Sequence, residues 1–174
     1  MTLTSTSASA SPRLETARTF IAGFANLSAD ALVSTRTADC THLFAPASLG
    51  ALTTPKDNAT FAAHLAGLRD VLAGFPVTAK EMIESDIQNT VTVWATSNAL
   101  FRDELKDDGL PADEWAYRGE YIFLLTMDDT GRRIRRIVEF LDSKATDRLL
   151  LLMARARENR RKLLAANSAS LHSS

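Results

Sequence analysis

The stretch Trp115–Leu125 (WAYRGEYIFLL), together with Ile134–Leu141 (IRRIVEFL) after a short turn, decides the fold of this chain. Both segments predict β-strands. Side chains alternate between the two faces of a strand, so Tyr117, Gly119 and Tyr121 share one face, with the two tyrosines about 13 Å apart. A glycine inside a strand often marks a place where another molecule approaches the backbone closely. The pattern therefore predicts two phenols on either side of a gap.

The segment Asp128–Arg132 between these strands fits a three-residue hairpin loop with a left-handed glycine at its end. If Asp128 lies opposite Arg132, Glu139 lies opposite Tyr121, with their Cβ atoms about 5 Å apart. A carboxylate among aromatic residues needs a raised pKa or a hydrogen-bonded partner, and either makes a usable general acid or base. The alternative is a solvated Glu139 beside tyrosines that only fill a core.

The composition is that of a soluble globular protein with one domain. The chain has 174 residues, of which 45% are hydrophobic and 24% charged, and its net charge of -1 argues against a nucleic-acid binder. The single cysteine, Cys40, excludes an internal disulfide. The longest apolar run, Leu149–Ala154, is too short to cross a membrane, and the first residues do not resemble a secretory signal, so we expect a cytoplasmic protein.

Hydrophobic periodicity predicts helices alternating with strands in one domain spanning residues 13–166, between disordered tails at 1–12 and 167–174. The expected helices span residues 14–27, 29–34, 58–75 and 144–165, with Ser28, Asp57 or Asn58, and Ser143 as caps. The expected strands span residues 37–44, 77–87, 90–101, 115–125 and 134–141. This order predicts an α+β fold in which helices pack on one side of a curved, mostly antiparallel sheet. The result is a cone-shaped α+β barrel that encloses a pocket.

The order of these elements resembles that of a known family, and so do three segments of the sequence: Arg36–His42, Trp94–Ser97 and Trp115–Asp142. Over about Leu14–Arg157, the chain resembles the SnoaL-like branch of the nuclear transport factor-like superfamily. Within that branch it is most similar to small cofactor-free proteins of fungal natural-product pathways. These include isomerases of polyketide intermediates and a semipinacolase-type isomerase of indole alkaloids.

The resemblance implies a catalytic set of one arginine, two tyrosines and one glutamate, which match Arg36, Tyr117, Tyr121 and Glu139. It implies an acid/base-assisted rearrangement or tautomerisation of an aromatic polyketide or indole alkaloid, with no cofactor. An aromatic substrate would lie over Gly119, and Glu139 would accept a proton. Arg36 would stabilise an oxygen that gains negative charge, and the tyrosines would donate or relay protons.

Other residues have both a functional and a structural interpretation. His42 shares a strand face with Cys40 and is a candidate second base or substrate contact, although a satisfied core histidine is the commoner case. His64, at the edge of a helical apolar stripe, is a candidate pocket residue under the same caution. Trp94 is a candidate wall for an aromatic substrate, or a core residue. The three histidines have no metal-ligand spacing, so no metal site is expected.

Two other functions remain open at this point. A polyketide cyclase or dehydratase of the same fold would rely on His42 with an acid. A small-molecule-binding or dimerisation module of the same fold would have no chemistry, and an arginine, two phenols and a carboxylate converging in the pocket would argue against it. Relatives of this type commonly pair through the sheet, which predicts a homodimer that binds a small aromatic molecule and neither nucleic acid nor membrane.

Overall fold

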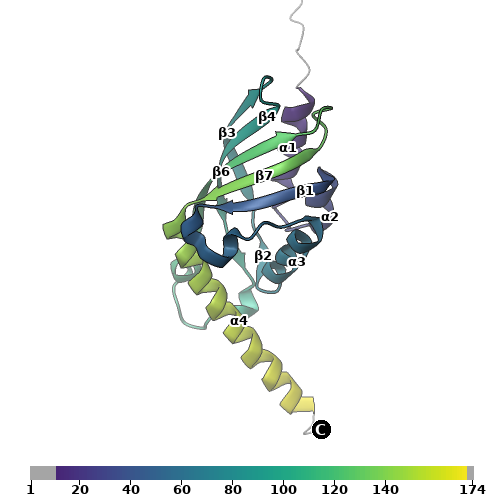
Figure 1. Ribbon diagram of the computed structural model, residues 1–174. Helices are drawn as coiled ribbons and strands as arrows, with labels where there is room; N and C mark the ends of the chain where they lie inside the picture. Colours follow the sequence, from purple (N-terminus) through teal and green to yellow (C-terminus); the bar gives the residue numbers. More distant parts are fainter. Residues whose placement is uncertain (1–10, 172–174) are drawn as a thin grey trace, which may run out of the picture.

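A computed structural model describes residues 11–171, and its centre is a five-stranded sheet with the order β1-β7-β6-β4-β3 (Figure 1). β1 runs parallel to β7, whereas the other neighbouring strands are antiparallel. The strands are β1 Arg36–Ala45, β3 Val77–Ser85, β4 Thr90–Asn98, β6 Arg118–Met127 and β7 Ile134–Leu141. The predicted α+β class is confirmed, and the sheet stays open at β1 and β3 instead of closing into a barrel.

Four helices accompany the sheet. They are α1 Pro12–Ala22, α2 Ala29–Ser34, α3 Asn58–Arg69 and α4 Ser143–Leu171. The first three begin after a side chain that accepts a backbone N–H from the first turn; these caps are Ser11, Ser28 and Asp57. At α4 the cap is Asp142, whose carboxylate accepts the Ala145 N–H at 3.1 Å, instead of the expected Ser143.

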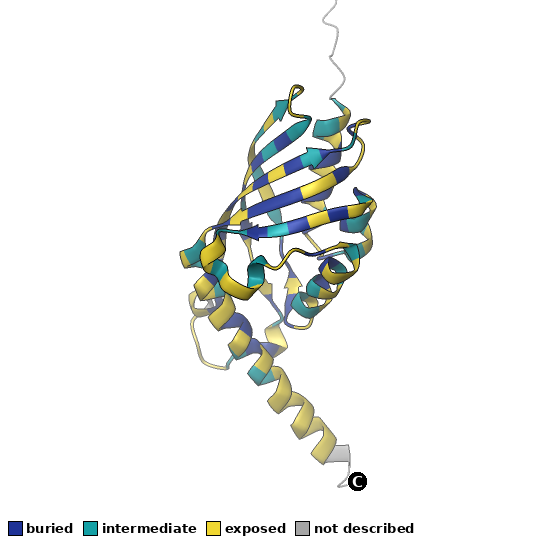
Figure 2. Cartoon of the chain, viewed as in Figure 1, coloured by how far each residue is buried: buried dark blue, intermediate teal, exposed yellow. Residues whose placement is uncertain are grey.

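The core lies between the inner face of the sheet and the helices. Buried and exposed residues alternate along the strands, as the colours of Figure 2 show. On the inner face, Phe123 of β6 meets Phe20 and Phe24, with ring centroids 6.0 and 5.8 Å apart. These contacts fix α1 and the turn after it against the sheet. The helix thereby covers part of the inner face of the sheet.

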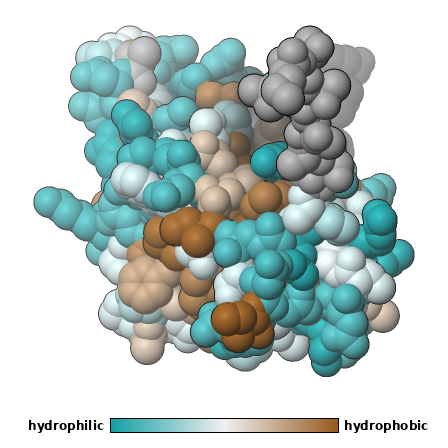
Figure 3. Space-filling model, turned by 90° about the horizontal axis from the view of Figure 1, so that it is seen from above, coloured by the Kyte–Doolittle hydropathy of each residue, from teal (hydrophilic) through white to brown (hydrophobic). Residues whose placement is uncertain are grey.

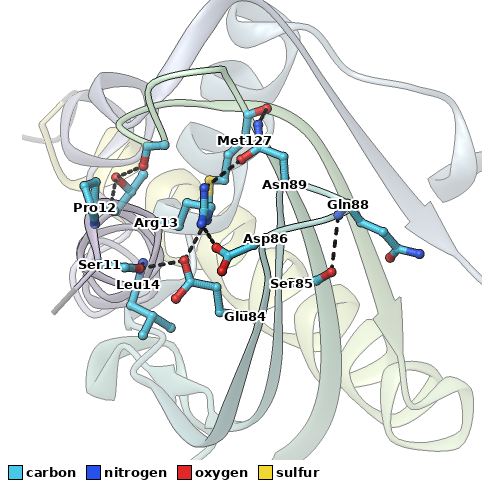
Figure 4. Close-up of polar contacts among 12 residues, drawn as sticks. Ser11, Pro12, Arg13, Leu14, Glu84, Ser85, Asp86, Gln88, Asn89 and Met127 are labelled. Carbon is cyan, nitrogen blue, oxygen red and sulfur yellow. Dashed lines mark hydrogen bonds and ion pairs between the residues drawn. The ribbon is translucent and has the colours of Figure 1, made fainter.

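Polar contacts hold the start of α1 to the β3–β4 hairpin (Figure 4). The Arg13 guanidinium lies 2.6 Å from the Glu84 carboxylate through Nε and also pairs with Asp86. Ser11 Oγ donates to the same Glu84 carboxylate at 2.7 Å, and Asn89 Nδ2 donates to the Met127 carbonyl at 3.1 Å. The β3–β4 hairpin is therefore bound to α1 and to the β6–β7 hairpin.

The predicted register of the β6–β7 hairpin is wrong by two residues. The Asp128 N–H donates to the Arg133 carbonyl at 2.8 Å, so the loop is one residue longer than expected, and a further irregularity follows Thr126. Glu139 consequently lies opposite Phe123 instead of Tyr121. Gly131 does adopt the expected positive φ, of 69°. Because the shift is an even number of residues, Glu139 keeps its predicted face.

Two predicted boundaries also differ. The helix expected to run to Phe75 ends at Arg69, because Leu72–Gly74 forms strand β2. This strand pairs with β5, Leu100–Phe101, which was expected to be the end of the strand at residues 90–101. Trp115 lies in a short 3-10 helix, Ala112–Trp115, and the strand starts only at Arg118. In both places, contacts between distant segments override the local pattern.

The last helix is longer than expected. It continues past the expected end at residue 165 to Leu171, through Ala-Asn-Ser-Ala-Ser-Leu, in which alanine and leucine are strong helix formers and asparagine and serine are weaker ones. Figure 2 shows its second half as exposed and extending away from the domain. Of the expected tails, residues 1–10 and 172–174 lie outside the described residues. Within residues 11–171, no helix is long and apolar enough to cross a membrane.

Candidate active site

A cavity lies between the inner face of the sheet, α3 and α4. Its volume is about 90 Å³. Most of its wall is apolar. The apolar lining comes from Phe24, Leu27, Phe44, Leu52, Phe61, Leu65, Leu68, Phe75, Leu141, Leu149, Leu150 and Met153, and the polar lining from His64, Tyr117, Tyr121, Glu139 and Thr146. An apolar cavity with a few convergent polar groups is the usual form of a small-molecule site.

Glu139 projects from β7 into this cavity and is 5% exposed. Its Oε2 atom lies 2.9 Å from Nε2 of His42, a fully buried side chain on the neighbouring strand β1. The parallel pairing of β1 and β7 brings the two residues together. Burial raises the pKa of Glu139 to about 8, although the Lys56 ammonium opposes this shift. At neutral pH the carboxyl group is therefore mainly protonated.

His42 is held as a neutral imidazole. Burial, followed by the positive charges of Arg36 and Lys56, keeps its pKa well below the usual value. The ring stacks on Phe61 at 4.6 Å, and its backbone exchanges two hydrogen bonds with Lys56, of 2.8 and 2.9 Å. A neutral imidazole next to a neutral carboxyl group leaves the proton of Glu139 available for transfer. His42 thus fixes the acid in place from behind the cavity wall.

The two predicted tyrosines meet at their hydroxyl groups. Tyr117 Oη and Tyr121 Oη lie 2.7 Å apart, and Ser97 Oγ donates to Tyr121 Oη at 2.9 Å. Burial raises the pKa of both phenols, which keeps them protonated at neutral pH. The pair therefore acts as a hydrogen-bond donor and not as a phenolate base.

Gly119 makes this meeting possible. A Cβ atom at this position would lie 2.1 Å from Tyr117 Oη and 2.5 Å from Tyr121 Oη, distances that no side chain tolerates. The gap predicted over the glycine is therefore filled by the two phenol groups and not by a substrate. Gly119 is absent from the cavity wall, which corrects its predicted substrate contact.

We expect Gly119→Ala to separate the two phenols and to destabilise the fold by about 1–3 kcal/mol, the usual cost of overpacking a core. Urea denaturation measures the change in the free energy of unfolding. Gly67→Ala is the matched control, because a Cβ atom there meets nothing within 4 Å. A stability unchanged by Gly119→Ala would contradict the close contact of the two hydroxyl groups with this backbone.

Known proteins with the same architecture were found by sequence and by structure. No family model matches the chain. The Austinoid biosynthesis cluster protein H of Aspergillus calidoustus is 29% identical over 136 residues, which are 77% of this chain and 85% of that protein. The crystal structure of BvnE pinacolase from Penicillium brevicompactum matches with a TM-score of 0.70 at 23% identity, over 84% of this chain and 96% of its own.

An NTF2-like protein of unknown function from Burkholderia pseudomallei matches with a TM-score of 0.62 at 15% identity, over 80% of this chain and 98% of its own. The chain has the nuclear transport factor-like fold. This is the fold that the sequence resemblance predicts, and the structural neighbours share it. In this nuclear transport factor-like cone, the cavity occupies the space between the curved sheet and the helices that cover it.

The cone brings four of the predicted site residues to the cavity wall: His64, Tyr117, Tyr121 and Glu139. Burial, followed by the positive charges of Lys56 and Arg157, lowers the pKa of His64 to about 4, so this side chain is neutral. Trp94 lies on the outer face of the sheet, where its indole N–H donates to Glu120 at 2.7 Å. It does not form the predicted wall of the pocket.

Arg36 and His42 are buried but do not line the cavity. The Arg36 guanidinium lies 4.4 Å from the centre of the Phe61 ring, and none of its three nitrogens has a hydrogen-bond partner among the described residues. Its contact with a substrate oxygen stays a prediction. In the structure, its charge acts on the imidazole of His42, which also lies against Phe61.

Two functional neighbours were missed by the sequence analysis. Lys56 Nζ donates to the carbonyls of Leu52 and Thr54, both at 3.1 Å, and its charge acts on Glu139. Ser97 orients the tyrosine pair. No spacing in the sequence identifies Lys56, whereas Ser97 lies two residues after Ala95 and four after Val93, on the same face of the strand, and could have been placed on the inner face. Residues 11–171 contain no cluster of three metal-ligating side chains.

Proposed function

We propose that this protein is a cofactor-independent isomerase of secondary metabolism, which rearranges or tautomerises an aromatic polyketide or indole alkaloid intermediate by acid/base catalysis. The observation that carries the proposal is the Glu139 carboxyl group, with a pKa raised to about 8, at the end of an apolar cavity and 2.9 Å from the neutral His42. A group with a pKa near the working pH is efficient both as an acid and, after donating its proton, as a base.

A rearrangement of the semipinacol type needs only such a proton shuttle. In an α-hydroxyimine, Glu139 would protonate the imine nitrogen, one carbon–carbon bond would migrate to the imine carbon, and the hydroxyl group would become a ketone. The hydroxyl proton would return to the Glu139 carboxylate, so the step is balanced in protons and electrons. The tyrosine pair would donate a hydrogen bond to the oxygen of the substrate.

The similar proteins support this class of reaction. The structural neighbour BvnE is named a pinacolase, and the curated relative belongs to an austinoid biosynthesis cluster. The first name states a reaction class, for a protein of Penicillium, and the second places a protein of Aspergillus in a biosynthetic pathway. The identities of 23% and 29% leave the substrate of this chain open.

The 3-hydroxyindolenine of tetrahydrocarbazole, a simple α-hydroxyimine, provides a direct test. We expect the protein to accelerate its conversion to the spiro-indoxyl product. Absorbance follows the reaction, and mass spectrometry checks that the product has the same mass as the substrate. In parallel, 2-tetralone in D₂O tests tautomerisation through exchange of its α-protons, observed by NMR. If neither probe reacts faster than in buffer with bovine serum albumin, the isomerase proposal fails.

A cyclase or dehydratase of the same fold is the second candidate. The His42–Glu139 hydrogen bond favours it, because such an enzyme combines a histidine with an acid. However, His42 does not line the cavity, so it can only act through Glu139. 2-Tetralone has no hydroxyl group to eliminate, and the hydroxyindolenine rearranges without a change of mass, so loss of water from a β-hydroxyketone such as 4-hydroxy-2-butanone would identify a dehydratase.

We further propose a homodimer that pairs through the outer face of the sheet. Apolar side chains cross neighbouring strands there: Trp94, Ile122 and Phe140 form one row, with exposed fractions of 37, 37 and 49%. Leu124 extends this row on the same face and is 42% exposed. In the view from above, by contrast, most of the surface is hydrophilic, with a small central hydrophobic region (Figure 3).

We expect light scattering to give twice the chain mass of 19.0 kDa. Phe140→Lys should shift the protein to the monomer, because it places a charge in the middle of the apolar row. Ile87→Lys is the matched control: Ile87 is also exposed but lies in the β3–β4 turn. A wild-type protein that elutes as a 19.0 kDa monomer would contradict the dimer.

A further inference from the structure

Lys56 does not line the cavity, but it contacts three residues of the site. Its backbone N–H donates to the His42 carbonyl at 2.9 Å, and its carbonyl accepts the His42 N–H at 2.8 Å. Its Nζ atom donates to the Leu52 carbonyl at 3.1 Å and lies 4.8 Å from the centre of the Phe44 ring. Phe44 and Leu52 line the cavity, and His42 holds the Glu139 carboxyl group. Lys56 therefore connects the cavity wall with the partner of the proposed acid.

The Lys56 side chain approaches Glu139 across the edge strand β1. Glu139 of β7 is aligned with Phe44 of β1, and Lys56 pairs with His42 on the other edge of that strand. The two side chains act on each other. Burial raises the pKa of Glu139 and lowers that of Lys56, and in each case the charge of the other residue opposes the shift.

The remaining titratable groups around Glu139 supply no comparable charge. Those that line the cavity or contact Glu139 are His42 of β1, His64 of α3, and Tyr117 and Tyr121 of β6. Their shifted pKa values keep all four neutral at pH 7. Among the described residues of α4, those that line the cavity carry no titratable side chain. Arg36 is charged, but its guanidinium lies against Phe61. Lys56 is thus the positive charge that stabilises the carboxylate form of Glu139.

We propose that Lys56 is a positioning residue of this site, which holds the wall at Leu52 and supplies the positive charge that stabilises Glu139 once its proton has passed to the substrate. The proposal rests on the proposed function for the role of Glu139 as the acid. A general acid is stronger when its conjugate base is stabilised in advance by a fixed charge. Because Lys56 lies behind Phe44, it acts through Glu139 and does not touch the substrate.

NMR titration of protein labelled with ¹³C at the glutamate carboxyl carbon tests this charge effect without any substrate. The Glu139 signal is the one that is missing from Glu139→Gln. We expect Lys56→Met to raise the pKa of Glu139 above its wild-type value by at least about half a unit, because an opposite charge is lost. Lys162→Met, which removes an exposed charge on the far half of α4, is the matched control and should leave this pKa unchanged. An unchanged pKa in Lys56→Met, or an equal rise in Lys162→Met, would overturn the proposal.

The lysine side chain provides a second measurement that needs no substitution of Lys56, in case Lys56→Met does not fold. In protein labelled with ¹³C at the lysine ε-carbon, the Lys56 signal should show an inflection near pH 8, where Glu139 loses its proton. This inflection should be absent from Glu139→Gln. Identical Lys56 titration curves in the two proteins would overturn the proposal.

Turnover of the hydroxyindolenine distinguishes a charge effect from a change of shape. In Lys56→Met, kcat at pH 7 should be lower by about threefold, because Glu139 is a weaker acid, and the loss of activity at high pH should move to higher pH. Lys56→Arg keeps the charge and should restore the wild-type pH profile. A Lys56→Arg protein with the pH profile of Lys56→Met would overturn the proposal.

The NMR titrations separate this proposal from the proposed function. If Lys56→Met raises the pKa of Glu139 but the wild type converts neither the hydroxyindolenine nor 2-tetralone, the charge effect of Lys56 on Glu139 stands and the isomerase proposal fails. If the wild type converts a probe but Lys56→Met leaves the pKa of Glu139 unchanged, the isomerase proposal stands and the role of Lys56 fails.

Discussion

Glu139→Gln is expected to lower the rate of hydroxyindolenine rearrangement by about 10²–10⁴-fold, the usual contribution of one positioned general acid or base. Glutamine has almost the same shape as a protonated glutamic acid and can keep the hydrogen bond to His42 Nε2. It cannot give up a proton to the imine nitrogen. The loss should therefore appear in kcat, with circular dichroism and 2-tetralone binding close to those of the wild type.

Glu120→Gln is the matched control for this substitution. Glu120 is an exposed glutamate on the outer face of β6, where it contacts Trp94 and Lys80. It should retain wild-type turnover. The pH profile gives a second readout: the wild-type rate should fall above about pH 8 as the Glu139 carboxyl group loses its proton. Near-normal turnover by a folded Glu139→Gln protein would remove Glu139 from the mechanism.

The position of Glu139 could be predicted from the sequence in spite of the wrong register. A hairpin that is displaced by two residues keeps every side chain on its face, because the period of a strand is two. The alternation of side chains along a strand could also have placed Trp94 on the correct face. Val93 and Ala95 alternate with it and are fully buried, so Trp94 must point to the outer face of β4. Alternation within one strand is thus the most reliable part of the sequence analysis.

Contacts between distant segments could not be predicted in this way. The His42–Glu139 hydrogen bond joins residues 97 positions apart, and it depends on β1 lying parallel to β7 at the edge of the sheet. The meeting of the two tyrosine hydroxyls depends on side-chain rotamers over Gly119, which strand geometry alone places far apart. Arg36 was expected in the pocket because of a family resemblance. The fold places Phe61 beside its guanidinium instead.

The buried pair of His42 and Glu139 should also give the protein an unusual dependence of stability on pH. In the folded state the pKa of Glu139 is raised to about 8, from an ordinary value of 4.5. Between these two values, the folded protein holds a proton that the unfolded chain has lost. The stabilisation is complete below pH 4.5 and is lost as the pH rises through 8. Stability should therefore fall with rising pH in this range.

His42 and His64 act in the opposite direction. Their folded-state pKa values lie below 6.5, so the unfolded chain binds more protons as the pH falls towards and below 6.5, and stability decreases there. Both histidines are present in the wild type and in Glu139→Gln, so the difference between these two proteins isolates Glu139 in the window from pH 6.5 to 8. With 1.36 kcal/mol for each pKa unit, we expect the contribution of Glu139 to the free energy of unfolding to decrease by about 1.5 kcal/mol across this window.

Urea denaturation of the wild type and Glu139→Gln at intervals of half a pH unit measures this decrease. The glutamine side chain does not titrate, so the variant should lack the decrease caused by Glu139, and the difference in the free energy of unfolding between the two proteins should change by about 1.5 kcal/mol from pH 6.5 to 8. Parallel curves for the two proteins would mean that Glu139 is already ionised at pH 6.5 in the folded state. The carboxyl group would then have no proton to donate at neutral pH, and catalysis would have to begin with Glu139 as a base.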